Sequence, residues 1–379
     1  MNIDMSFNER AEEALRVAGH SVIQDFYPAP FPEEVATVEL EKISLCRLLN
    51  GDDIEAERVF DICTTTGFFY LDMLDHAAGR RIWKSACDIC QLGHDLLAET
   101  PMEEKVKFKP LGGIRVFDRG YLARTADKVG EPDEREIFNV PQSELFGTKI
   151  EGGGLPSWLT EHEGTFKTTL EIGSVVANAV LAVLEKRLQL PTGSFTKLHR
   201  LNDDSGDFVR VLRYPGAPPN AKVGEGPDGF PPHKDAMSVA ILFTWLGGLQ
   251  IPDPNVKIDG LKVNSEDWRY VRPEPGYAIV NLGDAMEIFT SSILKSGVHR
   301  VIKAPGQQRP HERLAVLIAT RPENNSLMKA LKSPIIPTHK QDGPAMTSLE
   351  WGHSIIVGIR NKLQAEAEAR GSASVLANA

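Results

Sequence analysis

The chain contains two histidines and an aspartate whose residue types and spacing would suit a divalent metal ion. His233 and Asp235 lie two residues apart in a proline-rich segment that leads into an apolar run. In an extended segment, side chains two residues apart leave the same face, so this imidazole and this carboxylate converge. His299, in the run Ser-Gly-Val-His-Arg-Val, is the natural candidate for a third ligand, contributed by a strand across the fold.

A histidine and an aspartate at this spacing also occur as ordinary loop residues. The surrounding sequence is therefore needed to distinguish a metal site from an ordinary loop. Gly247-Gly-Leu-Gln-Ile251 follows the pair, and Val280-Asn-Leu-Gly-Asp-Ala-Met-Glu287 precedes His299. Two histidines and one carboxylate on one face of a metal leave positions open for oxygen ligands, which is typical of non-haem Fe(II) oxygenases. Arg313 begins the apolar run 314–319, where a guanidinium would pair with a carboxylate through two parallel N–H donors. A structural ion pair is the alternative role for that arginine.

With these runs in place, the sequence resembles the 2-oxoglutarate/Fe(II)-dependent dioxygenases of the isopenicillin N synthase-like group. The resemblance covers residues 38–355. Its marks in the first half, such as Thr66-Gly-Phe-Phe-Tyr70 and Gly120-Tyr121, are individually weak. The H-x-D pair, the N-L-G-D-x-M-E run and the S-G-x-H-R-V run make the match specific.

The resemblance implies an iron site and a site for the co-substrate. Iron would be held by His233, Asp235 and His299. Arg313 and Tyr214 would bind the C5 carboxylate of 2-oxoglutarate. Fe(II), 2-oxoglutarate and dioxygen are the implied cofactor and co-substrates, with ascorbate as a possible stimulant.

The sequence departs from the family pattern at two positions of the co-substrate site. Ala315 stands where the family usually has serine two residues after the arginine, and Leu212 stands where an asparagine is frequent. Loss of one hydroxyl hydrogen bond would cost about 1–3 kcal/mol of co-substrate binding if nothing replaces it. Weaker 2-oxoglutarate binding and a replacement donor nearby are both open outcomes.

Three positions are candidates for contact with the substrate, because relatives line their pockets from the corresponding segments. They are Tyr121, Arg210 and Ala319. Arg210 could pair with an acidic or phenolic group, and its alternative role is that of a solvated arginine on a strand face. Trp245, on the strand after the first two ligands, is expected in the core.

The activity implied by the resemblance is oxidation of a small organic molecule, coupled to oxidative decarboxylation of 2-oxoglutarate. The outcome could be hydroxylation, desaturation or ring rearrangement, and natural-product biosynthesis is the expected setting. Two alternatives remain: an Fe(II) oxidase or cyclase of the same fold that does not use 2-oxoglutarate, and a non-catalytic jelly-roll that binds a small molecule. A zinc hydrolase is less consistent with the sequence, since no general base is placed near the three ligands.

Periodicity predicts an α+β fold in which a double-stranded β-helix, or jelly-roll, is backed by helices. Helical patterns predominate before residue 200, with the strongest helices at 80–100 and 163–190. After residue 208, short β-rich runs alternate with Gly, Pro, Asn and Asp turns, among them 208–214, 257–263 and 313–319. Closely spaced strands favour a sandwich or barrel over alternating βαβ units.

This change of pattern divides the chain into four expected parts. Residues 1–35 would be an arm laid on the surface, and residues 36–200 a helical N-terminal region. Residues 201–325 would be the catalytic jelly-roll, and residues 326–379 a helical C-terminal extension.

Composition places the chain among ordinary soluble proteins. It has 379 residues, 25% of them charged, and a formal net charge of −10. Because proteins that bind phosphate backbones carry a basic stripe, nucleic acid is not an expected partner. No signal peptide or membrane span is apparent, and four cysteines are too few for a disulfide framework. We therefore expect a cytoplasmic monomer or homodimer whose partner is a small-molecule substrate. Cys87 and Cys90, in a predicted helix, are expected to be structural.

Overall fold

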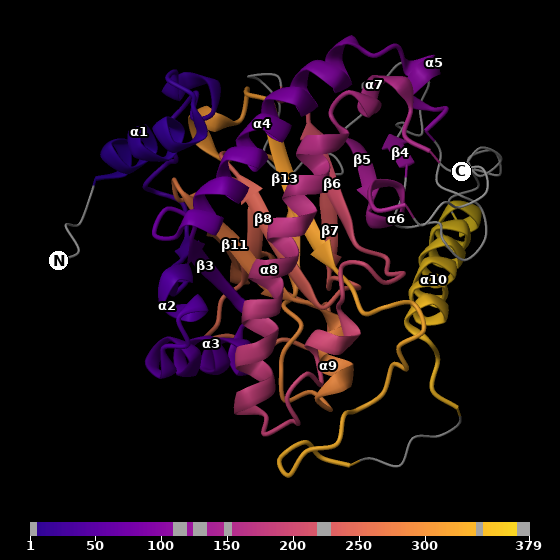
Figure 1. The fold of residues 1–379 in the computed structure, drawn as a ribbon. Coiled ribbons are helices and arrows are strands. Elements are labelled where there is room, and N and C mark those ends of the chain that lie inside the picture. Colours follow the sequence, from indigo (N-terminus) through magenta and orange to yellow (C-terminus); the bar gives the residue numbers. More distant parts are fainter. Residues whose placement is uncertain are drawn as a thin grey trace.

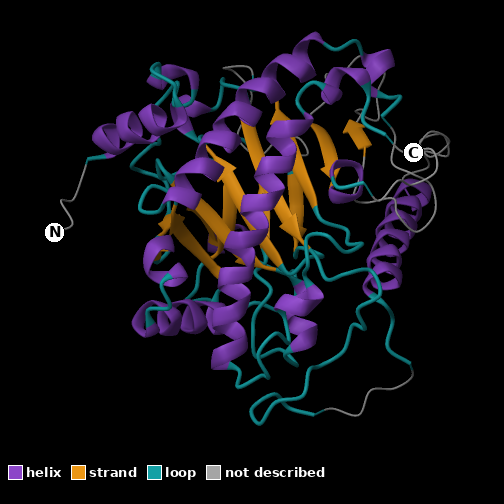
Figure 2. Ribbon diagram, viewed as in Figure 1, coloured by secondary structure: helices purple, strands orange, loops and turns teal. Residues whose placement is uncertain are grey.

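In this computed structural model, the described residues are 6–108, 120–123, 135–147, 154–217, 229–338 and 344–369. The larger of two sheets has the strand order β2-β3-β11-β8-β13-β6-β5-β4. Its strands in chain order are β2 (Lys42–Ser44), β3 (Phe68–Asp72), β4 (Gly120–Ala123), β5 (Glu136–Pro141), β6 (Phe208–Tyr214), β8 (Val239–Thr244), β11 (Tyr277–Leu282) and β13 (Arg313–Thr320). Figure 1 and Figure 2 show this sheet at the centre of the molecule.

The smaller sheet has the order β1-β10-β9-β12-β7. Its strands are β1 (Thr37–Val38), β7 (Phe230–His233), β9 (Leu249–Pro252), β10 (Trp268–Val271) and β12 (His299–Val301). Apolar side chains of both sheets, such as Leu249 and Val301 from one and Ala315 and Leu317 from the other, belong to one buried cluster. The two sheets thus enclose the core of a jelly-roll, as the sequence predicts.

Strand β13 shows how alternation gives the larger sheet two apolar faces. Ala315 and Leu317 belong to the cluster between the sheets, whereas Val316 and Ile318 belong to the cluster on the opposite face. Side chains of a strand alternate between its two faces, so a strand that is apolar throughout requires cover on both. Helices provide the cover on the second face.

Two long helices lie across that face, α4 (Ala77–Glu99) and α8 (Glu163–Arg187). Both contact β6 and β13, and they contact each other. Within the described residues, α8 has the length and hydropathy to cross a membrane, but 67% of its apolar window is buried inside the protein. We therefore interpret α8 as the core helix of this layer.

The remaining helices are short or peripheral. In chain order they are α1 (Phe7–Ala18), η1 (Ile23–Asp25), α2 (Leu45–Leu49), α3 (Asp53–Thr65), α5 (Met102–Lys105), α6 (Gln142–Leu145), α7 (Ser157–Thr160), η3 (Thr196–Leu198), η4 (Ser265–Asp267), α9 (Asp284–Phe289), η5 (Gly306–Gln308) and α10 (Ser348–Ala369). Helix α10 lies at the right-hand edge of the molecule in Figure 1.

The N-terminal segment differs from the expected surface arm. Residues 7–18 form α1, which begins with a capping box between Ser6 and Glu9. Ala14 and Leu15 are buried against α4, and the Trp83 indole donates a hydrogen bond to the Ala14 carbonyl. Within the expected arm, residues 7–18 thus form a helix packed on α4, because small apolar residues recur at helical spacing and have a partner there.

Strand boundaries agree with the sequence for β6 and β11 and differ at two other places. Residues 257–263 were expected to form a strand, but they contain only an isolated bridge between Asp259 and Lys262. Conversely, β7 is a strand that the sequence did not predict, because two of its four residues are prolines. Prolines are tolerated in an edge strand, and β7 is the edge of the smaller sheet.

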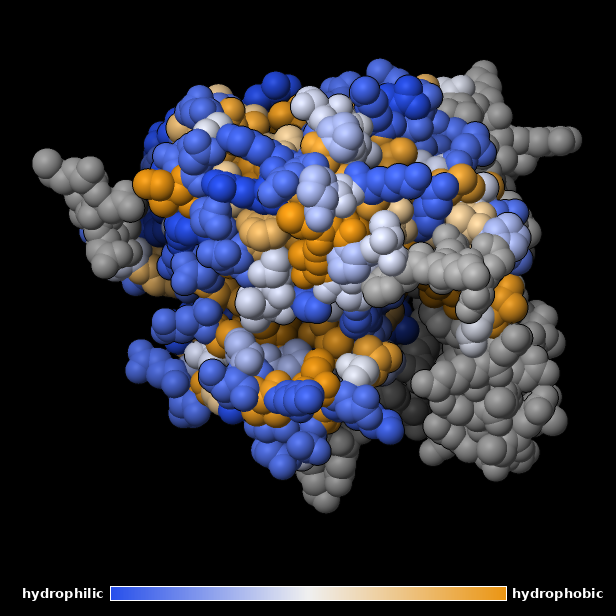
Figure 3. Space-filling model, turned by 90° about the horizontal axis from the view of Figure 1, so that it is seen from below, coloured by the Kyte–Doolittle hydropathy of each residue, from blue (hydrophilic) through white to orange (hydrophobic). Residues whose placement is uncertain are grey.

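The surface and the cysteines are consistent with the composition. Seen from below, hydrophilic residues cover much of the surface and hydrophobic residues lie in patches between them (Figure 3). All four cysteines are free, and Cys87 and Cys90 are buried in α4. Burial raises the pKa of both thiols, so the C-x-x-C pair has the structural character that the sequence predicts.

Candidate metal and co-substrate site

The three predicted metal ligands lie together in one pocket. His233 ends β7 and His299 begins β12, and the two residues are paired across these antiparallel strands. Asp235 Oδ1 lies 3.8 Å from His233 Nε2 and 3.7 Å from His299 Nε2. The candidate ligand atoms of the three residues all lie within 4.8 Å of one another. Among the described residues, this is the cluster whose spacing suits a metal ion.

Backbone carbonyls orient both imidazoles. His233 Nδ1 lies 2.8 Å from the Pro231 carbonyl oxygen, and His299 Nδ1 lies 3.1 Å from the Gly297 carbonyl oxygen. In the tautomer that donates from Nδ1, each Nε2 keeps its lone pair, and metal-binding histidines are commonly held in this way. Burial, together with the nearby His299, lowers the pKa of His233 to about 4. At neutral pH His233 is therefore uncharged, as a metal ligand must be.

Asn281 fixes the third candidate ligand. Its amide Nδ2 donates a 2.9 Å hydrogen bond to Asp235 Oδ2, which leaves Oδ1 facing the two histidines. Although burial opposes ionisation, His299, His233 and this hydrogen bond hold the pKa of Asp235 below its usual value. The carboxylate is thus ionised and directed by one amide.

The residues after Asn281 allow its strand to approach Asp235 closely. A Cβ added at Gly283 would lie 2.5 Å from the Asp235 carbonyl oxygen and 2.3 Å from that of Met237. The Asp284 backbone N–H donates to the same Asp235 carbonyl at 2.8 Å. The Asn-Leu-Gly-Asp run therefore holds Asp235 in two ways: the Asn281 side chain donates to its carboxylate, and the Asp284 backbone donates to its carbonyl.

Arg313 and Tyr214 line the same pocket and are direct partners across β13 and β6. The Arg313 guanidinium carbon is 5.0 Å from the centre of the Tyr214 ring, and only 3% of Arg313 is exposed. Burial lowers the pKa of Arg313, while the charge and hydrogen bond of Tyr214 oppose that shift. Gly248, at φ +126°, makes room for the arginine, since a Cβ there would lie 3.3 Å from Arg313 Nε.

In the described part of the chain, Arg313 forms no ion pair with a carboxylate, so the structural ion pair considered above is not found there. Its Nε lies 3.4 Å from the Leu246 carbonyl oxygen, which is a weak contact. A buried guanidinium without an acidic neighbour is costly unless a ligand supplies the opposite charge. The site is thus suited to a carboxylate.

The two departures from the family pattern lie side by side in this pocket. Ala315 and Leu212 are direct partners across β13 and β6, and both line the pocket. The next strand places Thr244 beside Ala315, but the Thr244 hydroxyl already donates to the Leu246 carbonyl at 3.0 Å. The wall beside Arg313 is therefore apolar at both positions.

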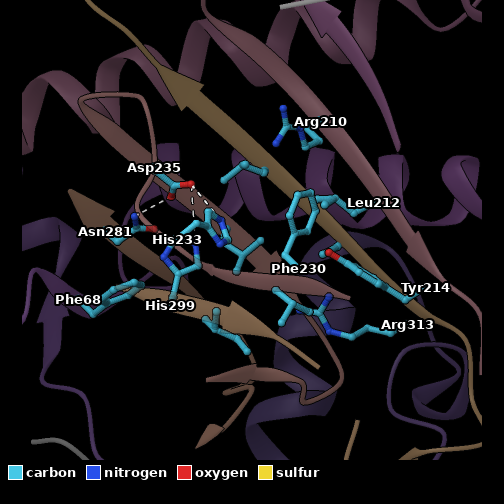
Figure 4. Close-up of a pocket in the computed structure, with 15 residues that line it drawn as sticks. Phe68, Arg210, Leu212, Tyr214, Phe230, His233, Asp235, Asn281, His299 and Arg313 are labelled. Carbon is cyan, nitrogen blue, oxygen red and sulfur yellow. Dashed lines mark hydrogen bonds and ion pairs between the residues drawn. The ribbon is translucent and has the colours of Figure 1, made fainter. Parts of the chain in front are cut away.

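The three predicted substrate positions have different environments. Arg210 lines the pocket, at the opposite end from Arg313 (Figure 4). Tyr121 is buried on the distant β4, where its hydroxyl donates to Glu136, and it is not among the residues that line the pocket. Ala319 is fully buried further along β13 and does not line the pocket either. The geometry thus retains Arg210 as a substrate candidate and places Tyr121 and Ala319 elsewhere.

Sequence reasoning missed several pocket residues. Asn281 was visible only as part of the run that carries the resemblance, without a role of its own. Phe68 packs edge-on against His299, with ring centres 5.6 Å apart, and Phe230 lies 5.5 Å from the His233 ring. Both phenylalanines line the pocket. Phe68 belongs to an aromatic run that the sequence does predict as a strand, so its position could have been considered. Phe230 belongs to β7, a strand that was not predicted.

These residues fit the groups that the resemblance implies. Two imidazoles and one ionised carboxylate are donors suited to a divalent first-row metal, and Fe(II) in such a site commonly has two histidine ligands and one carboxylate ligand. The apolar walls and the buried Arg313 suit a small dicarboxylate beside that metal. A zinc hydrolase would require a general base close by, and the pocket lining contains no acidic side chain other than Asp235.

Comparison with known proteins agrees with this chemistry. Residues 206–318 match the family described as the 2OG-Fe(II) oxygenase superfamily. A 2-oxoglutarate-dependent dioxygenase of Aspergillus fumigatus is 41% identical over 366 residues, which cover 93% of this chain and 94% of the relative. Thebaine 6-O-demethylase of Papaver somniferum is 25% identical over 333 residues, which cover 86% of this chain and 80% of that enzyme.

Solved structures show the same fold at lower identity. A full-length Neurospora crassa protein in complex with alpha-KG superposes with a TM-score of 0.69 at 19% identity, covering 86% of this chain and 99% of that one. The extent of the Aspergillus match and the family profile together show that this chain belongs to the 2OG-Fe(II) oxygenase superfamily, whose members are oxidoreductases that use Fe(II) and 2-oxoglutarate.

Proposed function

We propose that His233, Asp235 and His299 hold Fe(II), and that Arg313 and Tyr214 bind the C5 carboxylate of 2-oxoglutarate. The observation that carries this assignment is the convergence of the two Nε2 atoms on Asp235 Oδ1, at 3.8 and 3.7 Å. Arg313 supports it as a buried cation on the wall of the same pocket.

The reaction that we propose converts a substrate C–H bond, 2-oxoglutarate and dioxygen into a C–OH bond, succinate and carbon dioxide. Bound iron and 2-oxoglutarate supply the oxidising chemistry. The protein orients the co-substrate through Arg313, and Asn281 directs the Asp235 carboxylate. Apolar residues such as Leu242 and Leu317 exclude water from the pocket. Desaturation and ring rearrangement need the same site and differ in how the substrate lies.

We propose natural-product metabolism as the biological setting. The support is the similarity to thebaine 6-O-demethylase of Papaver somniferum, together with the fungal 2-oxoglutarate-dependent dioxygenases among the relatives. Membership in the isopenicillin N synthase-like group stays a prediction. So do the cytoplasmic location, which the four free cysteines favour, the monomeric or dimeric state, and the absence of a nucleic-acid or membrane partner.

Labelled 2-oxoglutarate tests the assignment of the three candidate metal ligands. The protein is supplied with Fe(II), ascorbate and the labelled co-substrate, and succinate is measured with and without a panel of small organic molecules. We expect succinate from the wild type and none above background from H233A, D235A and H299A, with iron binding lost in parallel. The variant H353A, on α10 and outside the pocket, is the matched control and should behave as the wild type.

The outcome also separates the alternatives. Oxygen uptake with a substrate but without any keto acid would indicate an oxidase that does not use 2-oxoglutarate. Iron bound equally well by the wild type and by all three alanine variants would show that the metal site lies elsewhere. Loss of 2-oxoglutarate binding in R313Q, with iron retained, is the result expected if Arg313 binds the co-substrate.

A further inference from the structure

The pocket contains a second cation that the co-substrate does not need. Arg210 lies on β6, on the same face as Leu212 and Tyr214, and all three line the pocket. Four residues along a strand correspond to about 13 Å between Arg210 and Tyr214. A five-carbon diacid held at Arg313 is too short to reach Arg210 as well. Figure 4 shows the two arginines at opposite ends of the pocket, with the candidate metal ligands to one side.

The Arg210 guanidinium is held in place by neighbouring residues. Its Nε donates a 2.8 Å hydrogen bond to Asn139 Oδ1, from the residue directly opposite on β5. Its guanidinium carbon lies 4.7 Å from the centre of the Phe208 ring. The hydrogen bond to Asn139 uses Nε. The two Nη groups can therefore donate two parallel hydrogen bonds to a carboxylate.

No carboxylate in the described part of the chain forms an ion pair with Arg210. Asp235 is the single acidic side chain among the residues that line the pocket, and it already faces the two histidines. Burial lowers the pKa of Arg210 to about 10, with Asp235 and Tyr214 opposing the shift and Arg135 adding to it. Arg210 therefore remains charged at neutral pH and lacks a close counter-ion.

A third arginine, Arg135, lies next to a residue of the pocket wall. The Arg135 guanidinium stacks 3.7 Å from the centre of the Phe230 ring, and Phe230 lines the pocket. Between this region and Arg313 the lining is mainly apolar and includes Leu212, Leu242 and Leu317. The cavity therefore combines Arg210 at one end with apolar walls beside the candidate metal ligands.

We infer that the substrate is an organic carboxylate with a largely apolar carbon skeleton, and that Arg210 binds its carboxylate group. This inference rests on the proposed function, because it takes Arg313 as the site of 2-oxoglutarate. Binding at Arg210 places the skeleton along the apolar walls, so that a carbon removed from the carboxylate is presented to the metal site. Arg210 is thus the residue that selects for an acidic substrate.

Matched pairs of acids and amides test the inference without knowledge of the natural substrate. The protein is loaded with Fe(II) and saturating 2-oxoglutarate in the absence of oxygen. Phenylacetate, cyclohexanecarboxylate, indole-3-acetate and octanoate are each compared with their primary amides by ligand-observed NMR. Saturating 2-oxoglutarate prevents the acids from occupying the Arg313 site. We expect at least one acid to bind more than about tenfold more tightly than its amide.

Variants then assign that preference to Arg210. R210Q should lose the preference of the wild type for acid over amide, R210K should retain part of it, and the control R269Q, outside the pocket, should retain all of it. Iron and 2-oxoglutarate binding are measured on the same samples and should be unchanged in R210Q. The inference is wrong if no acid binds better than its amide, or if the preference persists in R210Q. Failure of the wild type to bind iron or 2-oxoglutarate would instead refute the proposed function.

Discussion

At the scale of single residues, Asn281 shows how a side chain that is not a candidate ligand can determine the geometry of a metal site. Its amide donates to one oxygen of Asp235 and thereby turns the other oxygen toward both histidines. The three candidate ligands were predictable from sequence because their types and spacing are restricted. Asn281 was not, because a single asparagine within strand β11 has no role that its residue type reveals, and only its contact with Asp235 distinguishes it.

Replacing Asn281 by alanine should weaken iron binding. The carboxylate would lose the donor that fixes its direction, and such supporting contacts typically contribute a factor of about 10–100 in metal affinity. Anaerobic Fe(II) titration measures the effect. N264A removes an exposed asparagine far from the pocket and serves as the control. Equal affinity in N281A and the wild type would contradict this role.

Replacing Ala315 by serine should strengthen 2-oxoglutarate binding. The added hydroxyl would enter the apolar wall beside Arg313, where it could donate to the bound carboxylate. A hydrogen bond to a charged group contributes about 1.5–3 kcal/mol, so the dissociation constant should fall on the order of tenfold or more. Titration with 2-oxoglutarate is the measurement, with A319S as a control on the same strand outside the pocket. Unchanged affinity would mean that the carboxylate is already fully hydrogen-bonded.

At the scale of elements, buried polar contacts fix loops to the central strands. His199, directly after η3, places its Nδ1 2.7 Å from the Phe195 carbonyl oxygen and its Nε2 2.7 Å from the Ser238 hydroxyl. Ser238 directly precedes β8, the strand that follows Asp235. Burial lowers the pKa of His199 to about 4. The neutral imidazole therefore links this turn to the loop beside the candidate metal ligands.

This shift predicts a specific loss of stability in acid. Between pH 6.5 and 4 the unfolded chain binds a proton at His199 and the folded chain does not, so the free energy of unfolding falls as the pH falls. The contribution of His199 to the free energy of unfolding should decrease by about 2 kcal/mol between pH 7 and pH 5. Urea unfolding of the wild type, H199Q and the control H353Q on α10 measures it. H199Q should show the smaller decrease, and identical pH dependence in all three proteins would contradict the assignment.

At the scale of the whole molecule, the division into a helical half and a strand half describes the sequence better than the structure. Strands β2, β3, β4 and β5, all before residue 200, belong to the same sheet as β6, β8, β11 and β13. Strand β3 pairs with β11 from Phe68 to Asp72, and β5 pairs with β6 along its whole length. The larger sheet is therefore assembled from both halves.

We accordingly expect that residues 201–379 do not fold alone. Removing the first half would leave β11 and β6 each without one neighbouring strand and would uncover the apolar face that α4 and α8 protect. Circular dichroism during denaturant unfolding should show a cooperative transition for the full chain and none for this fragment. Adding residues 1–200 in trans is the control, because it restores the missing strands. A cooperative transition in the isolated fragment would contradict the expectation.

The sequence by itself determined the elements with strong periodicity and the residues with restricted chemistry. The two long helices, most strands of the second half and the spacing of His233, Asp235 and His299 depend on nearby residues, so a single chain reveals them. Helix α1 was missed although its capping box and apolar spacing are local signals, and strand β7 was missed because its prolines are unusual in a strand.

Only the tertiary structure decided which side chains share the pocket. It placed Arg210 on the pocket wall and Tyr121 in a hydrogen bond with Glu136, although both had been equal candidates. It also brought Asn281 to Asp235 across 46 residues of chain. The physical reason is that strand register and sheet order, rather than local propensity, determine which side chains meet between the two sheets.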